Sequence, residues 1–136
     1  MHHQRVQPIH YLLLSLCWAA TISYLSHQPG SGPDEITPWL PGEIKNLLHL
    51  PIFGLFALLL WLGIKHHFQN MAWAFIAVLS LTAAFGTLDE WHQSFIPGRT
   101  ASIEDIASDL IGGIIALSVA LYWQKHKPQK TRTNHG

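Results

Sequence analysis

Apolar residues in this chain gather into four long blocks separated by short polar segments. The blocks cover residues 9–26, 44–64, 71–91 and 103–123. Each block is close to the ~20 residues that an α-helix needs to cross about 30 Å of hydrocarbon. We therefore predict an all-α membrane protein, with four transmembrane helices that form one compact bundle over residues 9–123. Short polar tails, residues 1–8 and 124–136, flank this domain.

The charged residues are sorted between the two ends of the predicted helices. All eight Asp and Glu residues lie around two loops, between the first and second blocks and between the third and fourth. Most of the Lys and Arg residues flank the opposite helix ends, namely Arg5, Lys65, Lys125, Lys127, Lys130 and Arg132. Because basic segments are retained on the cytoplasmic side of a membrane, we expect both tails to be cytoplasmic and the acidic loops to face outward. A bacterial inner membrane is the expected location.

The first block is expected to remain part of the protein as an uncleaved helix. Its end, Ser23-Tyr24-Leu25-Ser26, lacks the small-residue pattern of a signal-peptide cleavage site. The only cysteine, Cys17, lies inside this block, so no disulfide can form within one chain. We expect Cys17 to pack as a small hydrophobic residue.

The second block is interrupted by Pro51, which removes a backbone donor and favours a kinked helix. Lys45 and His49 lie four residues apart and therefore share one face at the outer end of this helix. Lys45 can equally be an interfacial residue whose ammonium group extends toward water. A histidine inside a membrane span carries a desolvation cost, so we expect His49 to face a polar partner within the bundle.

The fourth block opens with a capping signal. Ser102 and Asp105 have the spacing of a capping box, with Asp in place of Glu or Gln, which favours Ser102 as an N-cap over a nucleophile. Asp109 lies one turn beyond Asp105 on the same face. That face continues through the small residues Gly112, Ala116 and Ala120. Because small residues let helices approach closely, both carboxylates are predicted to point into the bundle interior.

Polar side chains also gather where the third block ends, at Asp89, Glu90, His92 and Gln93. The segment that follows contains Pro97-Gly98, which is typical of a tight turn. Such a turn would fold Arg99 back over the helix ends. Its guanidinium could there hold a carboxylate or a headgroup phosphate through paired hydrogen bonds.

These segments together resemble the signature of VanZ-like membrane proteins. The resemblance rests on Asp89-Glu90-x-His92-Gln93, Pro97-Gly98-Arg99 and Ser102-x-x-Asp105, with support from Ser26-x-Gln28-Pro29 and Lys45-x-x-x-His49. The sequence departs from the family pattern at Asn46, at Phe53, where a hydroxyl is often found, and at Asp109, which is frequently Asn. The resemblance implies a four-helix membrane protein of the cell envelope. The founding member is linked to low-level resistance to the glycopeptide teicoplanin, and the resemblance implies no particular reaction.

The sequence is compatible with several classes of function. An envelope protein could bind a lipid-linked or anionic component at an outward polar site and so influence susceptibility to teicoplanin and lipoglycopeptides. A membrane-embedded hydrolase or transferase could instead use histidine and carboxylates as general bases, and arginine as a clamp, on a lipid headgroup. A purely structural polar clamp at the helix ends is a further interpretation. A transporter is disfavoured, because four spans without a matched pair of broken segments lack the usual architecture.

The candidate site residues are shared by these interpretations. The catalytic candidates are His49, Asp89, His92, Asp105 and Asp109. The candidates for headgroup binding are Lys45, Glu90, Gln93 and Arg99. The catalytic candidates could supply nitrogen and oxygen ligands, but their spacing matches no known metal motif, so no metal site is predicted. The residues identify no cofactor. Expected partners are membrane lipids, with a lipid-linked cell-wall precursor or a lipoglycopeptide as ligand, and no nucleic acid.

Overall fold

A computed structural model describes residues 7–29 and 42–126, with side chains from residue 47 onward in the second segment. It contains four long helices, α1 (Pro8–Ser26), α2 (Gly42–Ile64), α3 (Met71–Gln93) and α4 (Ile103–Lys125), and a short 3-10 helix, η1 (Lys65–His67), between α2 and α3. The described segments contain no strand. Each long helix begins and ends within two residues of its predicted block. The prediction of an all-α bundle of four helices is confirmed.

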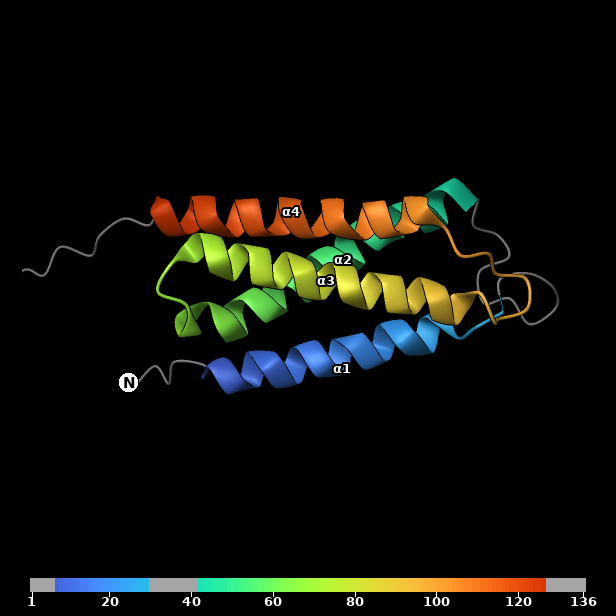
Figure 1. Ribbon diagram of the computed structural model, residues 1–136, viewed down its shortest axis with the longest axis horizontal. Coiled ribbons are helices and arrows are strands. Elements are labelled where there is room, and N and C mark those ends of the chain that lie inside the picture. Colours follow the sequence, from blue (N-terminus) through green and yellow to red (C-terminus); the bar gives the residue numbers. More distant parts are fainter. Residues whose placement is uncertain (1–6, 30–41, 127–136) are drawn as a thin grey trace, which may run out of the picture.

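Successive helices run in alternate directions, so that each is antiparallel to the next (Figure 1). α2 packs against all three other long helices, while α1 and α4 lie on opposite sides of the α2–α3 pair. The ends of α1 and α3 therefore meet the beginnings of α2 and α4 at one end of the bundle. We call this the acidic end, because Asp89, Glu90 and Asp105 lie there.

Local sequence signals account for where the helices begin. Pro8 occupies the first turn of α1, where its missing N–H costs nothing. Asn70 caps α3, since its Oδ1 accepts a hydrogen bond from the Ala72 N–H at 2.8 Å. α2 continues through Pro51, and close to this point the Trp18 Nε1–H of α1 donates to the Ile52 carbonyl at 2.9 Å. α1 is thus joined to α2 by a polar contact within the apolar region.

The distribution of apolar side chains is that of a membrane protein. The main buried cluster is small and joins α2, α3 and α4 through Ala57, Trp61, Ala74, Val78 and Leu117. Large apolar side chains instead cover the outer surface, for example Leu16 at 67 %, Trp123 at 69 % and Ile103 at 84 % exposed. All four long helices contain a segment long and apolar enough to cross a membrane. An apolar exterior of this extent needs hydrocarbon around it.

Glycines permit a close approach between α2 and α4. A Cβ atom added at Gly112 would collide with the backbone carbonyl of Leu50. One added at Gly54 would lie 3.1 Å from the Gly112 carbonyl oxygen and 3.6 Å from the Ala116 Cβ. The small-residue face predicted for α4 thus lies against α2. Backbones at this distance exclude larger side chains, as in other membrane helix pairs.

We predict that Gly112→Ala lowers the free energy of unfolding by about 1–3 kcal/mol, because the added methyl group must displace backbone. Gly113→Ala is the matched control, since its Cβ would meet the flexible Leu79 side chain at 3.3 Å. The control should remain within about 1 kcal/mol of the wild type, because alanine also favours the helix. Denaturant titration in detergent measures both. Equal effects at the two positions would contradict this account of the α2–α4 contact.

Candidate functional site

Buried polar side chains are concentrated at the acidic end of the bundle. Within the described residues, the buried polar side chains elsewhere, Ser15 and Thr82, bond to carbonyls of their own helices. The remaining buried polar residues are Ser26, Asp89, Glu90, Gln93, Asp105 and Asp109. They come from α1, α3 and α4, and they include four carboxylates, Asp89, Glu90, Asp105 and Asp109, which we call the acidic cluster. Such groups are costly in an apolar environment and mark a functional site by default.

Asp89 connects α3 to the end of α1. Its Oδ2 accepts a hydrogen bond from the Ser26 hydroxyl at 2.7 Å and a second from the Gln93 amide at 2.9 Å. Asp89 and Gln93 lie one turn apart on α3, which places both side chains on the same face. One carboxylate oxygen therefore joins two helices that are distant in sequence.

Glu90 connects α3 to the beginning of α4. Its Oε2 accepts a hydrogen bond from the Ser102 N–H at 2.8 Å, and its Oε1 accepts one from the Gln93 amide at 3.2 Å. The Ser102 hydroxyl in turn accepts from the N–H groups of Glu104 and Asp105, so Ser102 is the N-cap of α4. The backbone of Ser102 thus joins the start of α4 to α3, while its side chain caps α4.

His49 of α2 is held by Asp109 of α4. The His49 Nδ1 lies 2.9 Å from the Asp109 Oδ1, and Asp109 is only 1 % exposed. The imidazole ring also stacks in parallel on Phe53, with ring centroids 5.9 Å apart. Because an ionised carboxylate can only accept hydrogen bonds, this contact assigns the proton to Nδ1. In the neutral ring the other nitrogen, Nε2, is then a lone-pair acceptor, whereas in the imidazolium both nitrogens donate.

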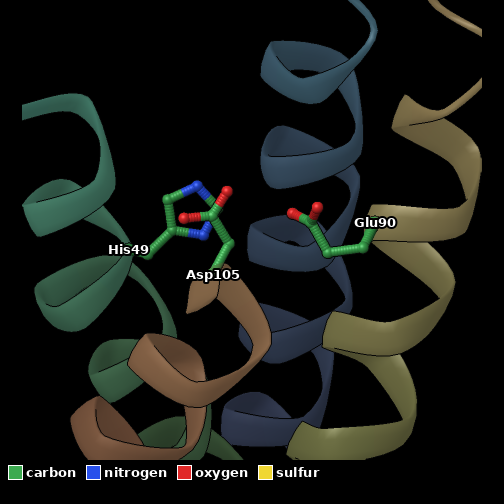
Figure 2. A group of neighbouring side chains, drawn as sticks. All are labelled: His49, Glu90 and Asp105. Atoms are coloured by element: carbon green, nitrogen blue, oxygen red, sulfur yellow. The ribbon is translucent and has the colours of Figure 1, made fainter. Parts of the chain in front are cut away.

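Two carboxylate oxygens of the cluster, Asp105 Oδ1 and Asp109 Oδ2, are buried and have no hydrogen-bond partner in the part of the chain that the structure describes. Asp105 lies beside His49 and Glu90, and one ligand atom from each of these three residues lies within 4.8 Å of the others (Figure 2). Asp109 Oδ2 lies against α3 at Gly86, where an added Cβ would be 2.5 Å away. Partnerless buried carboxylate oxygens are uncommon, because each forfeits the hydration it had in water.

Arg99 lies at the edge of the cluster, and within the described segments it donates to no carboxylate. Its Nη1–H donates to the Gln93 Oε1 at 3.0 Å, while Nε–H and Nη2–H donate at 3.3 Å to the carbonyls of Gln28 and Leu25. The predicted fold-back of the turn is observed, and Gly98 at its tip has a positive φ of 74°. The partners differ from the expected carboxylate, because the guanidinium instead satisfies carbonyls at the free end of α1.

The predicted site residues do not all converge. His92 is exposed and faces α1, where its Nε2 lies 3.1 Å from the His27 Nδ1 and the two rings stack. The candidate His92 therefore lies outside the acidic cluster, since the neighbouring positions Asp89, Glu90 and Gln93 occupy the inward face. The side chain of Lys45 lies outside the described residues.

A cavity of about 220 Å³ lies beside the cluster, between α1 and α3. It is lined by Ser23, Phe85, Leu88, Asp89 and His92. Its lining combines the apolar residues Phe85 and Leu88 with the polar residues Ser23, Asp89 and His92. The acidic cluster is thus adjacent to a space with both apolar and polar walls.

Two residues of the site were not among the predicted candidates. Ser26 had a signal in the sequence, since it belongs to the Ser26-x-Gln28-Pro29 motif. Gly86 had none, because an isolated glycine within an apolar block is indistinguishable from a packing residue. Its role follows only from the proximity of Asp109.

The fold and the site define a four-helix membrane protein with a buried acidic site at one end. The model of the VanZ/LLP1 family matches residues 6–124, and the chain therefore belongs to this family. A comparison with curated proteins finds no match. A comparison with solved structures finds none either.

Proposed function

We propose that this VanZ/LLP1 protein acts in the bacterial inner membrane, where its acidic end opens outward and binds a lipid-linked component of the cell envelope. The observation that carries the proposal is the concentration of four buried carboxylates at one end of an apolar bundle. Membrane proteins retain such groups where they bind or transform a ligand. The protein would thereby influence susceptibility to teicoplanin and related lipoglycopeptides, as the founding VanZ protein does.

The charge pattern supports an outward acidic end. Lys65 and Lys125 lie at the opposite end of the bundle, together with the beginning of α1. Further basic residues follow Lys125 in the C-terminal tail. Basic residues near membrane spans favour the cytoplasmic side, so both termini would be cytoplasmic and the acidic cluster would face the envelope.

Two features support a ligand with an anionic headgroup and an apolar part. Arg99 uses three of its five N–H donors in the hydrogen bonds described above, so that among the described residues two donors are left for an anionic oxygen. The cavity beside Asp89 has apolar walls at Phe85 and Leu88. A lipid-linked cell-wall precursor, or a membrane lipid, combines both chemical properties.

A second candidate function is hydrolysis or group transfer at the headgroup. It is favoured by the His49–Asp109 contact, in which a carboxylate orients an imidazole so that its second nitrogen is available as a general base. The nucleophile would be water or an acceptor hydroxyl. The competing interpretation is a clamp that only fixes the helix ends, and the variants below separate it from both functions.

The topology is tested by thiol labelling in a Cys17→Ser background with single cysteines at Ser31, Asn70 or Thr133. We expect a membrane-impermeant maleimide added to intact cells to label the cysteine at position 31 and to leave positions 70 and 133 unlabelled. Permeabilised cells provide the control that all three thiols can react. Labelling at position 70 from outside, with none at position 31, would place the acidic end in the cytoplasm and contradict the proposal.

The function is tested by Arg99→Lys and Asp105→Asn in a permeable host whose teicoplanin susceptibility is altered by the wild-type protein. Both variants should accumulate normally in the membrane and lose the altered susceptibility. Arg99→Lys is the sharper variant, because it keeps the charge and removes the planar fork. Exposed Glu104 on the first turn of α4 supplies the matched control, and Glu104→Gln should retain the wild-type phenotype.

A clamp predicts a different result. If Arg99 only fixes the helix ends, Arg99→Lys would leave the carbonyls of Leu25 and Gln28 without this donor, at about 1–3 kcal/mol each, and would deplete the protein from the membrane. Depletion that accounts for the lost phenotype, or a wild-type phenotype in both variants at normal abundance, would refute the proposed role of the acidic end.

A further inference from the structure

We infer that His49, Glu90 and Asp105 form a binding site for a divalent transition-metal ion. The inference goes beyond the proposed function and does not rest on it. The three residues come from α2, α3 and α4. One possible ligand atom from each lies within 4.8 Å of the other two (Figure 2). Ligands bound at ~2.0–2.2 Å around a tetrahedral ion are about 3.4 Å apart. Small side-chain rotations would therefore suffice to close the site around an ion.

The availability of donor atoms supports the site. Asp105 is buried, and its Oδ1 has no hydrogen-bond partner among the described residues. In the neutral imidazole that donates its Nδ1–H to Asp109, the His49 Nε2 has a free lone pair. Each Glu90 oxygen accepts one hydrogen bond and retains a second lone pair. All three side chains can thus donate electrons to an ion without breaking a described hydrogen bond.

The outer contacts are those that orient metal ligands. A ligating histidine usually donates its second N–H to a carboxylate, which fixes the ring and strengthens its donor nitrogen. Asp109 makes this contact with His49 at 2.9 Å. Glu90 is fixed in the same way by the Gln93 amide and the Ser102 N–H. Two of the three ligands are therefore already oriented from outside the site.

The charge balance favours a cation. Four carboxylates are buried at this end, and among the described residues they meet at most one ion pair, His49–Asp109. The described hydrogen bonds of Arg99 go to Gln93 and to two carbonyls. An uncompensated carboxylate in a low-dielectric environment is strongly unfavourable. A divalent ion between Glu90 and Asp105 would supply positive charge where the Asp105 oxygen lacks a partner. It would also reduce repulsion from Asp109 and Asp89.

The donor set selects the class of metal. One imidazole nitrogen with two carboxylates suits Zn²⁺ or Mn²⁺, while Ca²⁺ and Mg²⁺ prefer ligands that are all oxygen. Three protein ligands leave at least one coordination position open, as in metal sites that bind an exchangeable ligand. The sequence pattern did not indicate this site, because positions 49, 90 and 105 have no local ligand spacing.

The test uses the full-length chain purified in detergent, stripped with chelator and then titrated with Zn²⁺ or Mn²⁺ alone. Isothermal titration calorimetry and elemental analysis should give one high-affinity ion per chain. His49→Gln and Asp105→Asn should each abolish this binding, and Asp109→Asn should weaken it about 10- to 100-fold. His66→Gln and Glu104→Gln are matched controls, because both side chains are exposed. His66 lies in η1, at the opposite end of the bundle, and Glu104 precedes Asp105 on α4 but does not share its buried face.

A spectroscopic measurement detects the nitrogen ligand directly. The Mn²⁺-loaded wild type should show a nitrogen coupling from the His49 ring in pulsed electron paramagnetic resonance, and this coupling should persist in both controls. Circular dichroism and gel filtration establish that each variant is folded before it is titrated. Absence of high-affinity binding in the wild type would overturn the inference. Binding that survives in folded His49→Gln and Asp105→Asn, or a manganese spectrum without nitrogen coupling, would overturn it as well.

Discussion

The fold depends on one constraint, which is that carboxylates buried in an apolar bundle must find partners on neighbouring helices. Asp89 meets this constraint through Ser26 of α1 and Gln93 of α3, and Asp109 meets it through His49 of α2. Each contact removes part of the cost of burying a charge and also fixes one helix relative to another. The apolar surfaces of the helices cannot supply this specificity, because lipid contacts them as favourably as another helix does.

The two ends of the bundle are consequently built on different principles. In the middle and toward the termini, α2 and α4 are held by close backbone approach at Gly54 and Gly112 and by the apolar cluster around Trp61. At the acidic end, hydrogen bonds replace tight apolar packing, and a cavity of about 220 Å³ remains between α1 and α3. Close helix packing in the rest of the bundle maintains the fold, so the acidic end can contain a polar ligand site.

Helix number and helix bounds could be predicted from the sequence, because a block of ~20 apolar residues has one stable conformation in a membrane. The inward face of α4 could also be predicted, since Asp105, Asp109 and Gly112 follow its periodicity. Pairings between helices could not be. Ser26 and Asp89 are 63 positions apart, and Arg99 binds Gln93 and two carbonyls where a carboxylate was expected. The orientation of His92 could not be predicted either, because its ring lies against His27, which is 65 positions away in the sequence.

The most direct test of the central constraint is a double-mutant cycle between Ser26→Ala and Gln93→Met, with the free energy of unfolding measured in detergent. Both residues donate to the same oxygen of Asp89, so each single variant leaves that oxygen one partner and the double variant leaves it none. We predict that the double variant loses about 1 kcal/mol more than the sum of the two single losses, within the range found for coupled neighbours. Losses that add to within about 0.3 kcal/mol would contradict the account. They would mean that the buried carboxylate does not join α1 to α3.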